Sequence, residues 1–235
     1  MNSSRKPLVF IISAPSGSGK STLTNEILKL VPNLDFSISY TTRAPRGSEQ
    51  NGKQYHFVKM DEFNRMVAAG EFLEYANVHG NCYGTAREFL RQAGRGGHDL
   101  LLDIDVQGAA QIKRNLTDAI SIFVLPPDRG TLEWRLRNRK EDPEDVIQRR
   151  LLTATREIEE YDKYDYVLIN DQLEKSIERL QAIVLSERLR REQRTCSEEE
   201  RSIIDRAERL RLASLKEKVQ PILASFRVPA APARS

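Results

Sequence analysis

Short apolar runs alternate along the chain with stretches in which apolar residues recur at helical spacing. Residues 8–13 form a run followed at once by a loop, which is typical of a buried strand. Leucine and isoleucine recur near helical spacing over 20–30, and Pro32 then stops the predicted helix. Further strand-like runs occur at 100–102, 120–125 and 166–169. Helical stretches separate them at 107–113, 131–137 and 145–158. This alternation predicts an α/β fold with helices on both faces of a parallel sheet.

Three segments depart from the alternation. Residues 37–87 are richer in Gly, Asn and Tyr, and we interpret them as an inserted subdomain. Residues 126–158 are dense in Arg and Glu with few large apolar side chains, a composition typical of a solvated, mobile lid. Residues 188–235 are charged and helix-prone, and they end in a Pro- and Ala-rich stretch that we expect to be disordered. The main domain is therefore expected to span 7–187.

The last segment contains a predicted helix start at Ser197, because serine is a good cap and three glutamates occupy the next positions. A narrow apolar stripe follows at Ile204, Leu212, Leu215 and Val219. Pro221 is expected to end or kink this helix. The pattern leaves open whether the stripe docks on the rest of the chain, pairs with another subunit or belongs to a solvated helix. Since no predicted site residue lies beyond Arg194, we expect truncation there to leave activity largely intact and to alter, at most, stability or self-association.

Composition and charge exclude several classes of protein. The 235 residues include 37 basic and 34 acidic side chains, a net charge of +3, which is no signature of nucleic-acid binding. The longest apolar run is far shorter than the ~18 residues of a membrane-spanning helix, and no signal-peptide core or cleavage site follows it. Cys82 and Cys196 lie far apart without a C-x-x-C pair, as expected in a reducing cytosol. We therefore expect a cytoplasmic protein with neither nucleic acid nor membrane as partner.

A glycine-rich loop between the first strand and the first helix predicts a phosphate-binding site. Residues 14–21 read APSGSGKS and match the pattern G-x-x-x-x-G-K-[ST] except at the first position. Glycines let the backbone N–H groups turn inward, and the helix N-terminus adds positive potential. Lys20 would neutralise β- and γ-phosphate oxygens, and the Ser21 hydroxyl would ligate Mg²⁺. The predicted loop contacts are Ala14, Pro15, Ser16, Gly17, Ser18, Gly19, Lys20 and Ser21.

The loop alone does not distinguish a kinase from an ATPase or a GTPase. Residues 105–108 read DVQG and imitate the D-x-x-G sequence of GTPases, but no N-K-x-D sequence occurs. Arg43 and Arg46, three residues apart, supply planar donor groups that suit phosphate. Tyr55 and Tyr83 have hydroxyls able to donate to the same oxygens. A second phosphate site beside a phosphate loop is what a phosphoryl transferase requires.

Several motifs, in the right order, make nearly the whole of 7–187 resemble the guanylate kinase family. They are SAPSGSGKST at 13–22, SYTTRAPR at 39–46, NGKQYHF at 51–57, EFLEYANVHGNCYGT at 71–85, LDIDVQGA at 102–109 and IND at 169–171. The family resembled accepts Ala at the position of Ala14. The resemblance implies a P-loop NTPase type of fold, with a five-stranded parallel sheet, a GMP-binding subdomain at 37–87 and a helical lid at 126–158. It also implies ATP with Mg²⁺ as phosphoryl donor, GMP as acceptor and dGMP as a weaker one.

The resemblance implies a role for each acceptor-site residue. The GMP phosphate is expected to contact Arg43, Arg46, Tyr55 and Tyr83. The base is expected to contact Glu74 and Ser39, helped by Thr85 and Asp103. Guanine chemistry agrees, because a carboxylate accepts from both N1–H and the N2 amino group, while adenine would set a lone pair against it. A buried polar site of this kind can reject the wrong base by roughly 10⁴-fold.

The resemblance likewise assigns the catalytic and donor-site residues. Converging cations stabilise the charge that spreads over the transferred phosphoryl group, and those expected here are Lys20, Arg46, Arg135, Arg139 and Arg150. Neighbouring Arg137 and Arg149 are interpreted as solvated, and Asn138 and Lys140 stand where many members have Gly. Asp105 is expected to bind the Mg²⁺ water shell or Lys20, and Asn170 and Asp171 to border the adenine.

Two other functions remain as alternatives. One is a catalytically inactive guanylate-kinase-like interaction module, which the retained Lys20, Ser21 and lid arginines oppose. The other is a kinase of a different nucleoside monophosphate, which Glu74 and Ser39 oppose. Neither the pattern nor the resemblance decides between a monomer and a homo-oligomer.

Overall fold

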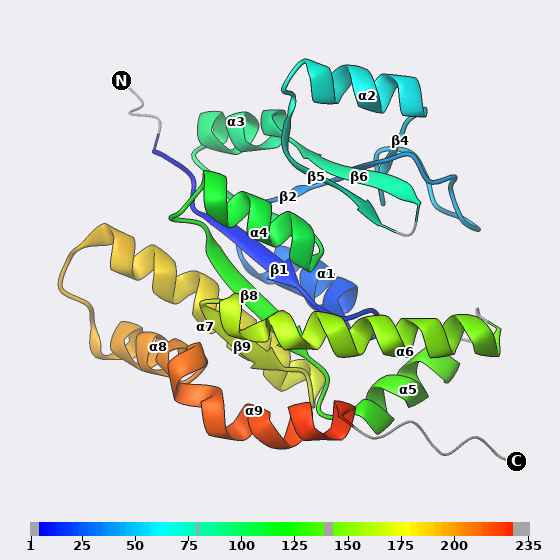
Figure 1. Cartoon of the computed structure of the whole chain (residues 1–235). Coiled ribbons are helices and arrows are strands. Elements are labelled where there is room, and N and C mark those ends of the chain that lie inside the picture. The colour runs from blue at the N-terminus through cyan, green and yellow to red at the C-terminus, as the bar shows by residue number, and fades with distance from the viewer. Residues whose placement is uncertain (1–4, 79, 139–142, 228–235) are drawn as a thin grey trace, which may run out of the picture. The chain divides into compact units, whose positions relative to one another are not determined.

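A computed structural model describes residues 5–78, 80–138 and 143–227 of the chain (Figure 1). Its elements are β1 Val9–Ser13, α1 Lys20–Leu30, β2 Leu34–Ser37, β3 Tyr40–Thr41, β4 His56–Phe57, α2 Met60–Ala68, β5 Phe72–Val78, β6 Asn81–Ala86, α3 Arg87–Gly96, β7 Asp99–Asp103, α4 Val106–Asn115, β8 Ile120–Leu125, α5 Arg129–Asn138, α6 Glu144–Ile158, a 3₁₀ turn Glu159–Lys163, β9 Tyr166–Ile169, α7 Leu173–Glu192, α8 Glu198–Glu208 and α9 Leu212–Phe226.

A five-stranded parallel sheet, in the order β2-β7-β1-β8-β9, carries most of the core. Val9 of β1 lies opposite Leu100 of β7, and Ile122 of β8 lies opposite Tyr166 of β9. Every residue of β1 and β8 is buried, because helices cover both faces of such a sheet. This burial explains the uninterrupted apolar runs and confirms the predicted α/β fold.

The chain divides into two compact units, Met1–Ile12 with Leu28–Ser121 and Ser13–Ile27 with Ile122–Ser235. The first unit carries a second sheet, in the order β4-β3-β6-β5, in which β5 and β6 pair antiparallel. Helix α2 contributes Phe63 and Met66 to a small apolar cluster with Phe72 of β5. These elements lie within the segment 37–87, whose status as a separate subdomain stays a prediction.

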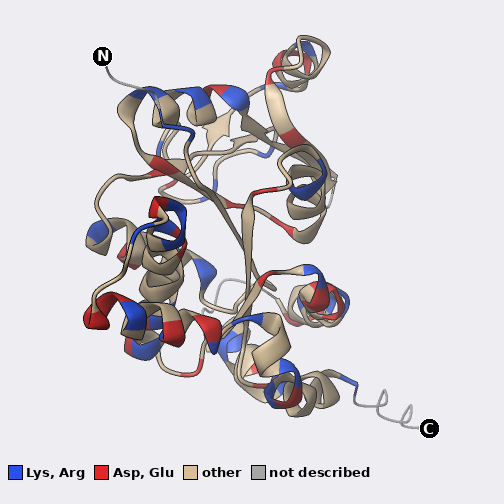
Figure 2. Ribbon diagram, turned by 90° about the vertical axis from the view of Figure 1, so that its left-hand side faces the viewer, with Lys and Arg blue, Asp and Glu red and all other residues tan. Residues whose placement is uncertain are grey.

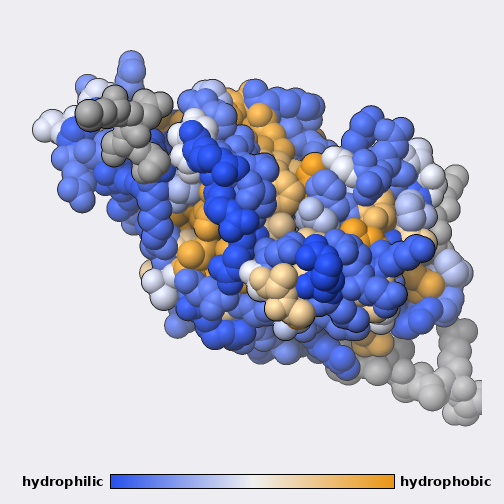
Figure 3. Space-filling view, turned by 90° about the horizontal axis from the view of Figure 1, so that it is seen from above, coloured by the Kyte–Doolittle hydropathy of each residue, from blue (hydrophilic) through white to orange (hydrophobic). Residues whose placement is uncertain are grey.

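The second unit contains the glycine-rich loop, α1 as far as Ile27 and all the described helices from α5 onward. The helices predicted at 20–30, 131–137 and 145–158 are confirmed as α1, α5 and α6. Acidic and basic residues are interspersed along α7 and α8 (Figure 2). Arg190 of α7 forms an ion pair with Glu208 of α8. The face shown in Figure 3 is mostly hydrophilic, in keeping with the 30% of charged residues. No helix in the described part of the chain is long and apolar enough to cross a bilayer.

The segment after α7 packs against β9 within the second unit. Ser197 and Glu200 form a capping box at the start of α8, which confirms the predicted helix start. Leu210 accepts a hydrogen bond from the Val167 N–H at 2.9 Å, and the Leu212 N–H donates to Asp165 at 3.2 Å. These bonds cover the outer edge of β9, the last strand of the sheet. The apolar side of α9 is buried through Leu215, Val219, Ile222, Leu223 and Phe226. Of the three possibilities left open, docking on the rest of the chain is the one observed.

Two details of this segment differ from the sequence-based expectation. The stripe belongs to two helices, since α8 ends at Glu208 and α9 starts at Leu212. Pro221 lies inside α9 and does not end it, so the predicted helix end there was wrong, while the alternative of a kink stays a prediction. Proline removes one helical hydrogen bond, but burial of the neighbouring Val219 and Ile222 offsets the loss. The tail from Pro229, expected to be disordered, lies outside the described residues.

Candidate active site

The phosphate loop follows β1 directly and depends on two glycines. Gly17 and Gly19 have φ angles of +92° and +90°, where L side chains are strained. A Cβ on Gly19 would lie 2.4 Å from the Asn170 side-chain nitrogen, so space also requires glycine there. The Leu23 N–H donates to the Gly19 carbonyl at 3.1 Å and begins α1. The loop therefore leads into a helix N-terminus, as an anion-binding site requires.

Asn170 and Arg135 hold this loop from elements far away in the sequence. The Asn170 amide donates to the Ser18 carbonyl at 2.7 Å, and the residue is buried. The Arg135 guanidinium donates to the same carbonyl at 3.4 Å and to the Asn170 carbonyl at 3.0 Å. Two predicted site residues, Arg135 and Asn170, thus meet at the loop. The Asn170 side chain was expected to border the adenine, and in this structure its amide donates to the loop backbone. Asp171 is paired with Arg179 at 2.8 Å.

Helix α5 also contacts the loop through apolar side chains. A Cβ on Gly17 would lie 2.9 Å from a Leu136 methyl carbon and 3.0 Å from a Leu132 methyl carbon. Both leucines are buried, so α5 is packed directly on the loop. Arg135 lies between them in sequence and points its guanidinium at the loop backbone.

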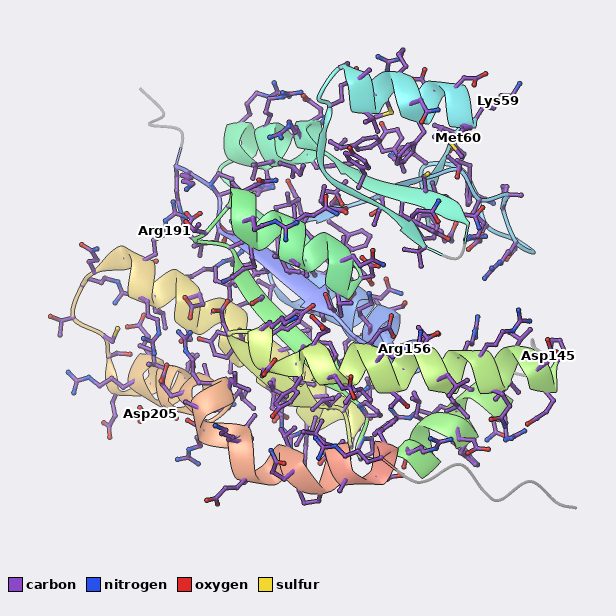
Figure 4. The ribbon with its side chains drawn as sticks, in the orientation of Figure 1. Lys59, Met60, Asp145, Arg156, Arg191 and Asp205 are labelled. Atoms are coloured by element: carbon purple, nitrogen blue, oxygen red, sulfur yellow. The ribbon has the colours of Figure 1, made fainter. Side chains whose placement is uncertain are left out.

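The other predicted lid arginines differ in position. Arg150 is half-buried on α6, whereas Arg139 lies outside the described residues. Arg137 forms an ion pair with Glu133 at 2.7 Å, and Arg149 forms one with Asp145 at 2.7 Å. Asp145 lies near one end of α6, and Arg156 lies toward the other end (Figure 4). Arg137 and Arg149 are exposed or nearly so, as their interpretation as surface charges requires.

The two predicted magnesium ligands are oxygen donors on different units. Ser21, in the first turn of α1, is exposed. Asp105 caps α4, where one carboxylate oxygen accepts from the Gly108 N–H at 2.9 Å. Hydroxyl and carboxylate oxygens fit Mg²⁺, which in phosphate sites takes one or two protein ligands besides phosphates and water. Accordingly, no group of three or more His, Cys, Asp or Glu residues suited to a metal exists among the described residues.

The first unit contains a buried carboxylate, Glu74 of β5. Thr85 lies opposite it on β6 and donates its hydroxyl to one Glu74 oxygen at 2.7 Å. Only 5% of Glu74 is exposed. Burial, with a smaller effect from the charge of Asp105, raises the pKa of the Glu74 carboxyl to about 7. A ligand that offers hydrogen-bond donors to this carboxylate would favour its ionised form.

Space for the Glu74 carboxylate depends on Gly108, a residue that sequence reasoning did not single out. A Cβ at this position of α4 would lie 2.7 Å from one Glu74 oxygen. The motif at 102–109 contains Gly108, but only the fold brings it beside β5. Ser39, the other predicted base reader, is half-buried, and its carbonyl accepts from the His56 N–H at 2.9 Å.

The predicted GMP-phosphate residues gather around Arg43. Its guanidinium is 5.3 Å from the Tyr55 ring centroid, and the rings of Tyr55 and Tyr83 are 5.8 Å apart. Burial and the charge of Asp103, at the end of β7, raise the pKa of Tyr55 to about 12. The phenol therefore keeps its proton and remains a donor. Arg46 is exposed, three residues after Arg43 and just before the turn at Gly47.

Glu49 is a second residue of this site that sequence reasoning missed. Its carboxylate accepts from both terminal nitrogens of Arg43, at 2.9 and 3.0 Å, and from the Arg46 N–H at 2.7 Å. Hydrogen bonds from Arg43 hold the pKa of Glu49 below its usual value. The only signal in the sequence is an acidic residue six positions after Arg43, beyond the turn that contains Gly47.

Comparisons with known proteins identify the family of this chain. The family model for guanylate kinase matches residues 4–187. The chain belongs to the guanylate kinase family. A guanylate kinase of Koribacter versatilis is 55% identical over 222 residues, which cover 93% of this chain and 95% of that protein. One from Geobacter metallireducens is 50% identical over 186 residues, or 79% of this chain and 92% of that protein.

The structure of a guanylate kinase also resembles this one. The crystal structure of guanylate kinase from Anaplasma phagocytophilum has a TM-score of 0.66 and 31% sequence identity, and the match covers 95% of this chain and 97% of that one. The predicted family resemblance is therefore confirmed. The Koribacter alignment of 222 residues is longer than the family match, so it includes part of the segment beyond residue 187.

Proposed function

We propose that this member of the guanylate kinase family transfers the γ-phosphoryl group of ATP to a phosphate oxygen of GMP, giving ADP and GDP. Glu74 is the observation that carries this proposal. Its buried carboxylate, oriented by Thr85, suits the N1–H and N2 donors of guanine, whereas adenine would present a lone pair. The phosphate loop in the same chain supports ATP as the donor. dGMP shares the base and is proposed as a weaker acceptor.

Each half of the site has its own proposed set of residues. In the acceptor half, the GMP phosphate would be held by Arg43, Arg46, Tyr55 and Tyr83. The base would be held by Glu74, with Ser39, Thr85 and Asp103 around it. Arg43 would exchange part of its contact with Glu49 for phosphate, because both ligands use the same guanidinium nitrogens.

In the donor half, the triphosphate would lie on residues 14–21, with Lys20 against the β- and γ-phosphates. Ser21 and Asp105 would hold Mg²⁺, which when bound neutralises charge on the phosphates. Arg135, Arg139 and Arg150 would stabilise the transferred group. No general base is needed, because the attacking GMP oxygen is already ionised. Asn170 and Asp171 would border the adenine.

We further propose that 7–187 acts as the kinase domain, with 37–87 binding GMP and 126–158 serving as lid. The two cysteines of the chain, Cys82 and Cys196, are free thiols and support a cytoplasmic location. The phosphate loop retains Lys20 and Ser21, so nothing favours the inactive alternative.

A coupled assay for ADP release tests the proposed reaction. The chain is offered GMP, dGMP, AMP, UMP and CMP, each with ATP, and with or without Mg²⁺. We expect turnover of GMP, weaker turnover of dGMP and strict dependence on Mg²⁺. Lys20→Ala serves as the inactive control. Equal turnover of AMP or UMP, or none of GMP, would contradict the proposal.

A further inference from the structure

The N-terminus of α5 receives a hydrogen bond from the opposite end of the chain. The first N–H groups of any helix have no partner within it. Asp128 satisfies one of them by accepting from the Thr131 N–H at 2.7 Å, and it also accepts the Thr131 hydroxyl at 2.8 Å. The Arg129 N–H donates instead to the hydroxyl oxygen of Ser225, at 3.1 Å.

Ser225 is well placed to act as a fixed acceptor. It lies in the last turn of α9, and its own hydroxyl hydrogen is used on the Ile222 carbonyl at 2.6 Å. Its lone pairs therefore face the Arg129 N–H. Ile222, Leu223 and Phe226 are buried around it, so α9 cannot swing away from α5 without exposing them. The hydroxyl joins the C-terminal helix to the first turn of α5.

Helix α5 in turn holds the phosphate loop. Leu132 and Leu136 leave no room for a side chain at Gly17, and Arg135 donates to the Ser18 carbonyl. Contacts thus run without a gap from Ser225 through the first turn of α5 to the loop. All of them lie within the second unit.

We infer that the C-terminal extension positions α5 against the phosphate loop, and that Ser225 is the positioning residue at the junction. The inference rests on the proposed binding of ATP by this loop. Without the Ser225 hydroxyl, the half-buried Arg129 N–H loses its acceptor and the first turn of α5 loosens. ATP then binds a loop that is less well ordered, whereas the acceptor site in the first unit is unaffected.

The full-length Ser225→Ala variant tests this inference through titration with Mg²⁺ and a non-hydrolysable ATP analogue. One hydrogen bond predicts an analogue affinity about three- to tenfold weaker than in the unmutated chain. GMP affinity is expected to stay unchanged. Ser214→Ala is the matched control, because Ser214 lies exposed near the start of α9.

A double-mutant cycle isolates the hydrogen bond itself. Arg129 is the first residue of α5, a position where proline is well tolerated and supplies no N–H. In an Arg129→Pro background, Ser225→Ala is expected to cause no further loss of analogue affinity. Arg129→Ala, which keeps the N–H, is the control for the lost guanidinium, and in that background Ser225→Ala should retain its full effect.

The outcomes separate this inference from the proposed function. If the unmutated chain fails to bind the analogue, ATP binding itself is disproved. If it binds and Ser225→Ala binds equally well, the positioning role is overturned. That role is likewise overturned if Ser214→Ala weakens binding as much, if GMP affinity falls in parallel, or if Ser225→Ala acts undiminished in the proline background.

Discussion

The burial of Glu74 underlies its proposed recognition of guanine and also lowers the stability of the folded protein when the carboxyl is ionised. With a pKa near 7, the carboxyl is largely protonated in mildly acidic solution and largely ionised above pH 8. Only the ionised form accepts from both guanine donors. If Glu74 binds the base as proposed, GMP binding at lower pH must first remove a proton from it.

We expect GMP affinity to fall as the pH drops from 8 to 6, approaching a tenfold loss per unit well below pH 7. Isothermal titration across this range measures the effect. The GMP phosphate has its own pKa near 6 and titrates whichever protein is used. Glu74→Gln is therefore the control, because it removes only the titration of the Glu74 carboxyl. The variant should bind GMP more weakly and with a shallower dependence on pH. Parallel curves for the two proteins would contradict the assignment of Glu74.

The same substitution is expected to stabilise the ligand-free protein in alkaline solution. A carboxyl whose pKa is raised on folding stabilises the native state while protonated, and this stability is lost as the pH rises from about 4.5 through 7. Glu74→Gln removes the loss, which is at most about 3 kcal/mol. Urea unfolding should show a larger gain for the variant at pH 8 than at pH 5. An equal gain in the free energy of unfolding at pH 8 and pH 5 would show that ionisation of Glu74 does not cause the gain.

Gly108→Ala is expected to weaken GMP binding about tenfold, because its methyl group would displace the Glu74 carboxylate. ATP-analogue affinity should not change. Gly94→Ala in α3 is the matched control, since its nearest contact is Pro7 at an ordinary 3.6 Å. Alanine favours both helices, so neither variant should lose stability through helix propensity. An unchanged GMP affinity in Gly108→Ala would show that the carboxylate has room to move.

At the scale of elements, the helices and strands that depend on adjacent residues could be predicted from the sequence. Features that depend on contacts between distant residues could not. The strand at 8–13 and the helix from Lys20 follow from adjacent residues, so the sequence was enough to predict them. The continuation of α9 past Pro221 depends on burial by other elements, which overrides the local preference. Glu49 opposite Arg43 required knowledge of the turn between them. Ser225 lies 96 residues from its partner, so no local pattern predicts their contact.

Docking of α8 and α9 reverses the expectation for truncation after Arg194. Removal of this segment would expose the edge of β9 and the start of α5, and would leave the Arg129 N–H without Ser225. We now expect the truncated chain to have a lower thermal midpoint and a higher KM for ATP. Thermal denaturation and the coupled assay measure the two effects. If the truncated chain has the same thermal midpoint and the same KM for ATP, the extension is dispensable for stability and for ATP binding.

At the scale of the whole molecule, phosphoryl transfer requires both nucleotides to meet while water is excluded. We therefore expect 37–87 and 126–158 to approach each other when a bisubstrate analogue binds. Met60 on α2 and Leu152 on α6 are exposed and suit distance labels through cysteine substitution, with Cys82 and Cys196 changed to serine. The distance between the labels should shorten with the analogue and not with ATP alone. Identical distances in all states would contradict closure.

The backbone pairing that covers β9 also sets the order of events in a cell. Within the described part of the chain, the outer edge of β9 is paired by Leu210 and Leu212, which are synthesised well after β9 itself. Until they arrive, Val167 and its neighbours present an open strand edge, the kind of surface through which nascent chains associate. The second unit is thus completed only after Leu212 has been synthesised, and a ribosome stalled within α8 would hold a chain whose β9 edge is uncovered.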